Sequence, residues 1–329
     1  MVSYSGKENS PVVLFCGAAH YYIPEPNTEH GPANDLQVEG RKAYLKDRKG
    51  FVEKAVEQSH GLYEALMAAG ASVVSLQELE GHPDQVFTAD ASLSLVDHGS
   101  VKTVMSHFSN EERQPEVDLH RAFFDSVDPE RSMIVNPHNF EGTGDNLYDP
   151  FRDVFWSGYA VDPGRHSAAH GRSSKLAHTF LRKTLGVPVV SLQTKKPFFH
   201  IDTALGALPR GEMIVYPGGL ENFDEKGFCE FAFERYGLKA SENYIAIDKA
   251  DAMAYGANFR VFGNTVVMPE CSQKLQDQIK KRGYDVVTVD LKQFIYSGGA
   301  VHCMANRIDE PRIDGGYVQE ENGFLMPAL

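Results

Sequence analysis

The chain has 329 residues, of which 42% are hydrophobic and 23% are charged, a composition typical of a soluble globular protein with a large core. Its net charge of −13, from 45 acidic and 32 basic residues, argues against nucleic acid as a partner and fits a cationic small molecule. No apolar run reaches the length of a membrane span, and four cysteines are too few for a disulfide scaffold. We therefore expect a cytoplasmic protein with reduced thiols, either monomeric or a homo-oligomer.

Five segments along the chain share one pattern, in which a predicted helix is followed by a predicted strand. In three of them, apolar residues at helical spacing stop at Gly70, Gly186 or Gly283, and a β-branched run follows. A glycine at this position is suited to the C-cap of a helix. Two weaker copies have Gly237 or an Asp-Pro turn in its place. In chain order, the five segments cover residues 56–76, 117–135, 173–193, 228–247 and 271–290.

Pairs of short strands accompany several of these segments. They are predicted at residues 92–96 with 101–105, 204–208 with 213–216, and 259–262 with 265–268. The turn inside each pair is rich in Gly, Asp, Asn or Pro, as hairpins require. The repeat is therefore strand, strand, helix, strand. Five copies favour a cyclic arrangement in one domain over residues 1–329, rather than an ordinary α/β sheet.

Candidate chemical residues occupy equivalent places in these copies. Asp90, Asn258 and Cys303 each lie about 20 residues after the glycine that ends the preceding helix. His200 and Asp202 lie about 15 residues after theirs. If the copies surround an axis, residues far apart in the sequence would converge there in one site.

Cys303 is the candidate nucleophile. It follows a glycine pair, Gly298 and Gly299, which permits backbone angles and close approaches that other residues do not. This setting, with a polar His302 beside it, favours a reactive thiol over a structural one. Cys16 lies in an apolar strand and is expected to belong to the core.

His200 is the candidate general acid and base, because an imidazole can take up and return a proton near pH 7. If residues 200–202 form a strand, the side chains of His200 and Asp202 lie on the same face. Asp90, Glu141 and Asp145 would add further carboxylates. Carboxylates around a thiol oppose its ionisation unless a cation lies among them. A planar guanidinium, which carboxylates bind in a bidentate manner, is the obvious candidate.

These motifs, taken in order, resemble those of the guanidino-group-modifying (pentein) superfamily, which includes arginine deiminases, dimethylarginine dimethylaminohydrolases and amidinotransferases. The resemblance spans about residues 11–310 and implies a five-module β/α propeller, a pseudo-fivefold arrangement of ββαβ units. The motifs are Phe87-Thr-Ala-Asp90, Glu141-Gly-Thr-Gly-Asp145, His200-Ile-Asp202 and Gly298-Gly-Ala-Val-His-Cys-Met304.

The resemblance also implies catalytic roles. Cys303 corresponds to the nucleophile, His200 to the acid and base, and Glu141 to the carboxylate that orients the histidine. Thr143 is an extra residue within the family's Glu-Gly-Gly-Asp motif, so Asp145 could replace Glu141 as the orienting group.

Substrate-binding residues follow from the same resemblance. Asp90 and Asp202 correspond to the pair that holds the substrate guanidinium. Arg165 and, as a weaker match, Arg113 correspond to arginines that contact the amino-acid end of the substrate. Residues 23–40 are predicted to form a long polar loop that could cover the site.

The implied reaction is hydrolysis of the guanidinium group of arginine or an N-methylated arginine. It passes through a covalent thiouronium on sulfur, yields citrulline plus ammonia or a methylamine, and needs no cofactor. Transfer of the amidino group to an amine is the alternative, although the short chain resembles the hydrolases more. A zinc site of His200, Asp202, His302 and Cys303 has suitable residue types without a zinc-binding spacing. The complete catalytic set disfavours a non-catalytic binder on the same scaffold.

Overall fold

The computed structural model describes residues 10–25, 35–159, 172–312, 317–319 and 325–327. Within them, five sheets have three strands each and the same topology. The middle strand of each sheet pairs antiparallel with one neighbour and parallel with the other. We name each unit after its middle strand. The strands are β15 (Asn306–Arg307), β1 (Val12–Phe15) and β2 (Ser72–Ser75); β3 (Ser92–Asp97), β4 (Ser100–Met105) and β5 (Ser132–Val135); β6 (Asn146–Asp149), β7 (Val154–Tyr159) and β8 (Val189–Gln193); β9 (Leu205–Ala207), β10 (Met213–Val215) and β11 (Tyr244–Ala246); β12 (Arg260–Phe262), β13 (Thr265–Pro269) and β14 (Asp285–Val289).

One long helix precedes the third strand of every unit. These helices are α2 (Arg48–Ala68), α3 (Gln114–Val127), α4 (Lys175–Leu185), α5 (Glu225–Ala232) and α8 (Gln273–Lys280). The predicted α/β class, the five helix–strand segments and the three hairpins are thus confirmed. The hairpin of β6 and β7 was not predicted. Residues 35–40, expected in a loop, begin α1 (Asp35–Lys46), and residues 26–34 lie outside the described residues.

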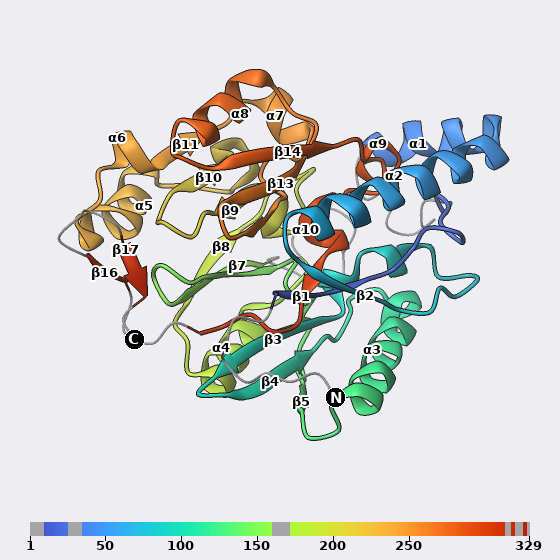
Figure 1. Ribbon diagram of the computed structural model, residues 1–329, viewed down its shortest axis with the longest axis horizontal. Coiled ribbons are helices and arrows are strands. Elements are labelled where there is room, and N and C mark those ends of the chain that lie inside the picture. The colour runs from blue at the N-terminus through green and yellow to red at the C-terminus, as the bar shows by residue number, and fades with distance from the viewer. Residues whose placement is uncertain (1–9, 26–34, 160–171, 313–316, 320–324, 328–329) are drawn as a thin grey trace.

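The β1 unit is completed by the far end of the chain. β15 pairs antiparallel with β1, which places Val13 opposite Arg307 and Leu14 opposite Asn306. Figure 1 shows the red β15 segment beside the blue β1 strand. Two distant segments therefore form one sheet, and Cys303 lies just before the strand that closes it.

Local sequence signals fix several helix ends. The hydroxyl of Ser174 accepts a hydrogen bond from the backbone of Ala177 (3.2 Å), and Ser272 does the same for Leu275 (3.1 Å), so both act as N-caps. At the other end of α4, Gly186 adopts the left-handed conformation, with φ of 70°.

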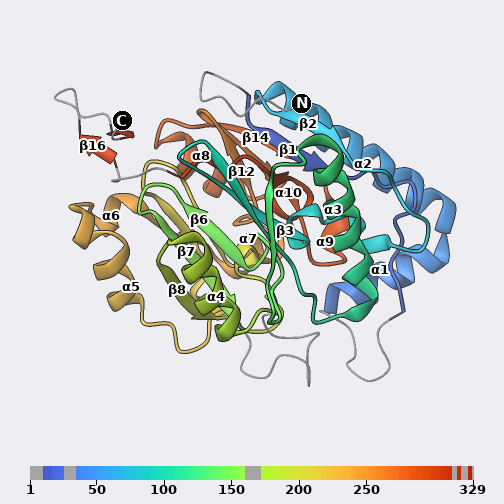
Figure 2. The ribbon, with the colours of Figure 1, turned by 90° about the horizontal axis from the view of Figure 1, so that it is seen from below.

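The five helices α2, α3, α4, α5 and α8 lie around the outside, where they pack against neighbouring units (Figures 1 and 2). Leu62 and Leu66 of α2 belong to one core cluster with residues of β1 and β14, so α2 joins the β1 and β13 units. α3 joins the β1 and β4 units in the same way, and α4 joins the β4 and β7 units. A fourth cluster connects the β7, β10 and β13 units. No helix in the part of the chain described here is long and apolar enough to cross a membrane.

Replacement of a core residue of α4 tests this packing. Leu181 is fully buried, whereas Leu176 on the same helix is 62% exposed. We expect Leu181→Ala to lower the free energy of unfolding by about 2–5 kcal/mol, because it leaves a cavity between two units. Leu176→Ala should change it by less than about 0.5 kcal/mol. Urea denaturation of both variants measures the difference, and equal effects would contradict the packing.

Candidate active site

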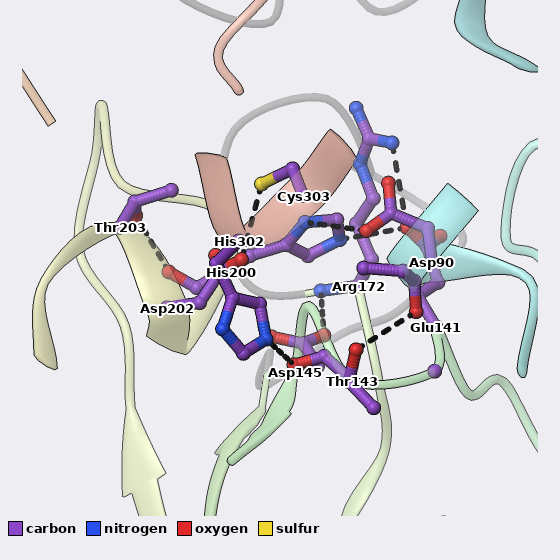
Figure 3. A network of polar contacts seen from close by, with 12 residues as sticks. Asp90, Glu141, Thr143, Asp145, Arg172, His200, Asp202, Thr203, His302 and Cys303 are labelled. Carbon is purple, nitrogen blue, oxygen red and sulfur yellow. Dashed lines mark hydrogen bonds and ion pairs between the residues drawn. The ribbon is translucent and has the colours of Figure 1, made fainter. Parts of the chain in front are cut away.

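Each of the five units places one polar side chain just before its first strand. Asp90 and Asp202 lie in 3₁₀ turns before β3 and β9, and Cys303 lies in the short helix α10 (Val301–Met304) before β15. Asp145 and Asn258 occupy the corresponding places before β6 and β12. All five are buried, with exposed fractions of 3% or less. Figure 3 shows the side chains of Asp90, Asp145, Asp202 and Cys303 gathered from ribbons of different colour, and hence from distant parts of the chain.

Hydrogen bonds join the five turns into a closed ring. Every turn donates to or accepts from the turn of the next unit, and the last turn returns to the first. The bonds run from Thr143 N to Ala89 O (2.8 Å), from Asp202 N to Gly144 O (3.2 Å), from Asn258 Nδ2 to Asp202 O (3.4 Å), from His302 N to Asn258 Oδ1 (2.8 Å) and from Thr88 Oγ1 to Met304 O (3.3 Å). The relative positions of the polar side chains are therefore fixed by the backbone that carries them.

Cys303 is held between a carboxylate and an amide. Its thiol donates to Asp202 Oδ2 (3.0 Å), and its sulfur accepts from Asn258 Nδ2 (3.1 Å). Burial, together with the charges of Asp202 and Asp90, raises the pKa of the Cys303 thiol well above its usual value. The preceding Gly298 has φ of 91°, and a Cβ on Gly299 would lie 2.4 Å from the Phe87 ring. The glycine pair is thus required by the backbone conformation and by the lack of space.

His200 lies between two carboxylates. Its Nε2 is 2.8 Å from Glu141 Oε2, and its Nδ1 is 3.7 Å from Asp90 Oδ1. Burial alone would lower the pKa of His200, but Asp90, Asp145 and Glu141 raise it to about 9. At neutral pH the ring is therefore an imidazolium, which can donate a proton.

The expectation that His200 and Asp202 lie on one strand is wrong. Residues 201–203 form a 3₁₀ turn, with His200 as its N-cap. The turn is closed by bonds from Thr203 and Ala204 back to the carbonyls of His200 and Ile201. The two side chains still enter the same site, because the turn and not strand alternation directs them there.

Glu141, and not Asp145, is hydrogen-bonded to the His200 ring. Burial alone would raise the pKa of Glu141, but Arg172 and His200 hold it well below its usual value. The Asp145 carboxylate instead accepts from the backbone of Arg172 (3.1 Å), Ser173 (2.8 Å) and Ile201 (3.3 Å). These hydrogen bonds connect the backbone that follows His200 to the segment that begins at residue 172.

Two buried carboxylate oxygens beside the sulfur have no hydrogen-bond partner within the described residues. They are Oδ1 of Asp90 and Oδ1 of Asp202. Burial and the neighbouring Asp90 raise the pKa of Asp202 to about 7, against the opposing effect of His200. Buried acceptors without a donor are costly, so the site is arranged for a ligand that brings donors and positive charge.

Of the two arginines predicted for the substrate, Arg113 lines the same pocket as His200 and Cys303. Arg113 is buried and donates to Asp90 (2.8 Å) and through two nitrogens to Glu116 (3.0 and 2.8 Å), so the protein already engages its guanidinium. Arg165 lies outside the described residues. Arg172, which the sequence analysis missed, packs over the Phe199 ring at 4.5 Å and lines the pocket. Both Arg165 and Arg172 follow a glycine, so the sequence offered no means of choosing between them.

A small pocket opens onto these groups. Its walls include Asp84, Asp90, Arg172, His200 and Cys303, and its volume of about 20 Å³ is room for one or two water molecules.

The described residues contain no group of three or more His, Cys, Asp or Glu that could hold a metal ion. His302 turns its Nε2 toward the carbonyl of Thr143 (3.2 Å). The zinc site considered from the sequence therefore gains no support from these residues.

The chain resembles proteins of known activity. Residues 25–309 match a family model described as N,N dimethylarginine dimethylhydrolase, eukaryotic. The bifunctional arginine dihydrolase/ornithine cyclodeaminase AgrE of Nostoc sp. is 31% identical over 80% of this chain, and the N(G),N(G)-dimethylarginine dimethylaminohydrolase of Mycobacterium tuberculosis is 28% identical over 77% of this chain and 75% of its own. The product-bound N-terminal domain of ArgZ, a cyanobacterial arginine dihydrolase, superposes with a TM-score of 0.76 at 27% identity, covering 92% of this chain and 99% of that domain. The chain spans about a third (34%) of the bifunctional relatives.

Replacement of Gly144 tests the geometry around His200. A Cβ on Gly144 would lie 2.4 Å from Asp90 Oδ1 and 3.0 Å from His200 Nδ1, so Asp90 must rotate away. We expect Gly144→Ala to lower the pKa of His200 by about one unit, because a stabilising carboxylate moves off. An NMR titration of the His200 ring measures the shift. Gly61→Ala on α2, where the new Cβ meets nothing closer than 3.9 Å, is the control. An unchanged pKa in Gly144→Ala would contradict the described contact.

Proposed function

The chain belongs to the N,N dimethylarginine dimethylhydrolase family, and on this basis we propose that it is a cysteine-dependent hydrolase of the guanidinium group of arginine or an N-methylated arginine. The products are citrulline and ammonia or a methylamine. Membership of the family agrees with the resemblance to the pentein superfamily. The relatives named for hydrolysis of arginine or dimethylarginine favour water over an amine as the acceptor.

The observation that carries this proposal is the pair of buried carboxylate oxygens, Oδ1 of Asp90 and of Asp202, that accept no hydrogen bond within the described residues and lie in the site of Cys303. A guanidinium is flat and cationic, and it offers N–H donors along its edges. Held by both carboxylates, its central carbon faces the sulfur. Its charge also offsets that of the carboxylates, so the thiol ionises when the substrate binds.

The first chemical step is attack of the Cys303 thiolate on the guanidinium carbon. His200, already an imidazolium, donates its proton to the departing nitrogen. The C–N bond breaks, an amine leaves, and a thiouronium remains on sulfur. Glu141 keeps the ring in place through Nε2 and favours its cationic form.

The second step uses the neutral imidazole that the first step leaves behind. His200 removes a proton from water, and the resulting hydroxide attacks the thiouronium carbon. The C–S bond then breaks as the hydroxyl of the adduct releases its proton to solvent, so the ureido product forms and the thiolate is regenerated. One histidine thus serves as acid and then as base.

Charged groups at the pocket wall support an amino acid as substrate. Arg172, whose Nη1 donates to Glu141 Oε2 (3.4 Å), could also bind a carboxylate, and Asp84 on the same pocket could bind an ammonium group. Arg113 acts mainly through Asp90, which it orients, and Arg165 remains a candidate for the carboxylate end. A zwitterionic end next to a guanidinium describes arginine and its methylated forms.

We also propose that the five units are the modules of a β/α propeller that forms one domain over residues 1–329. The common topology of the five sheets and the closed ring of hydrogen bonds between their first turns support this arrangement. The site then lies where the five modules meet.

Assays with arginine, monomethylarginine and asymmetric dimethylarginine test the activity. We expect citrulline together with ammonia, methylamine or dimethylamine, and a mass increase on Cys303 in protein quenched during turnover. Cys303→Ser should lower kcat by more than about a thousandfold, because the nucleophile is lost. Cys229→Ser, at a half-buried position of α5 outside the site, should leave it unchanged. Amidino transfer to an added amine without citrulline would overturn the hydrolase, and ornithine as the product would overturn the product assignment.

The pH dependence of kcat/KM tests the roles of Asp202 and His200 in the free enzyme. Activity should fall below about pH 7, as Asp202 is protonated and can no longer hold the cation. It should also fall above about pH 9, as His200 loses the proton that the leaving nitrogen needs. Glu141→Gln keeps an acceptor but removes a charge that raises the pKa of His200, so the alkaline limb should move to lower pH by about 1–3 units. If the alkaline limb of the kcat/KM profile lies at the same pH in Glu141→Gln as in the wild type, Glu141 does not act through His200.

A further inference from the structure

Asn258 is a fully buried asparagine whose amide faces the nucleophile. Its Nδ2 donates to the sulfur of Cys303 (3.1 Å) and to the carbonyl of Asp202 (3.4 Å). Its Oδ1 accepts from the backbone of His302 (2.8 Å) and of Cys303 (3.3 Å). An asparagine amide has two donor hydrogens and one oxygen that accepts twice, so all of its hydrogen-bonding capacity is directed at three residues.

This pattern fixes the orientation of the amide. If the amide were flipped, its NH₂ group would face two backbone N–H groups, and its oxygen would face the Asp202 carbonyl. Asn258 itself is fully buried, so its amide is not exposed to bulk solvent. The amide N–H therefore remains aimed at the sulfur.

The sulfur needs this donor most after it ionises. In the free protein the thiol donates to Asp202, but a thiolate has no hydrogen to donate, and the same carboxylate then repels it. The amide N–H of Asn258 keeps its bond, and hydrogen bonds to charged groups are roughly twice as strong as neutral ones.

We propose that Asn258 is a positioning residue of the reaction, which holds the Cys303 sulfur toward the substrate carbon and stabilises its thiolate. The inference rests on the proposed function, in which that thiolate attacks. Asn258 does so from the place in the β13 unit that corresponds to Asp90, Asp145 and Asp202 in other units. A neutral donor at this place avoids a third carboxylate beside the sulfur, which would oppose its ionisation.

The test compares two isosteric changes. Asn258→Asp keeps an acceptor for the α10 backbone but removes the donor to sulfur. Asn136→Asp is the matched control, because Asn136 is equally buried, donates to the Ala177 carbonyl (3.3 Å) and accepts from the backbone of His138 (3.1 Å) away from the site. The rate of Cys303 alkylation by iodoacetamide is followed by peptide mapping between pH 7 and 9, together with kcat, KM and thermal stability.

We expect Asn258→Asp to slow alkylation of Cys303 and to lower kcat by about 10–100-fold each, with KM changing by less than about threefold. Asn136→Asp should lower thermal stability by a similar amount without slowing alkylation. An equal change in alkylation in both variants, or a loss of kcat in Asn258→Asp with normal alkylation, would overturn the proposal.

A buried carboxylate at residue 258 could prevent folding, so Asn258→Ser is measured in parallel. Serine is neutral and has a hydroxyl donor, so we expect the rate of Cys303 alkylation to fall less in Asn258→Ser than in Asn258→Ala. Equal losses in these two variants would contradict a role for the donor. Alkylation of Cys303 needs no turnover, so it reports on Asn258 whether or not the protein hydrolyses a guanidine. A wild-type protein that hydrolyses no guanidine would refute the proposed function and leave the alkylation result for Asn258 interpretable.

Discussion

The closed ring of hydrogen bonds among the five turns is the constraint on which the rest of the site depends. Each turn contributes one buried polar side chain, and the ring fixes these side chains relative to one another before any ligand arrives. Two of the ring bonds use the side chain of Asn258, and one uses Thr88. Where a backbone group cannot reach the next turn, a short polar side chain bridges the distance. Catalytic groups held in this way need little reorganisation during reaction.

Charge balance is the second organising feature. Burial brings Asp90 and Asp202 close to a thiol that they keep protonated, and His200, Arg113, Arg172 and Arg260 provide positive charge nearby. Under the proposed function, a bound cation completes the site. Its reactivity depends on the ligand, because the same carboxylates that suppress the thiolate in the free protein attract the group that releases it.

The repeat and most of the candidate residues could be predicted from the sequence. Helical periodicity that ends at a glycine recurs along the chain, and the candidate residues lie at similar distances after these glycines. Other features lay beyond it. β15 has only two residues, and its pairing with β1 spans almost the whole chain, so no local signal marks it. The two-residue spacing of His200 and Asp202 suited a strand, but residues 201–203 form a 3₁₀ turn. The choice of Glu141 over Asp145 depends on which carboxylate the backbone has already satisfied, and this is visible only in three dimensions.

The pairing of β15 with β1 has a consequence for biosynthesis. β1 forms early on the ribosome, but its open edge stays without a neighbour until residue 306 has emerged. The same late segment brings the sulfur and closes the ring of turns. A chain that ends before this segment would therefore lack both the edge strand of the β1 unit and the sulfur of the site.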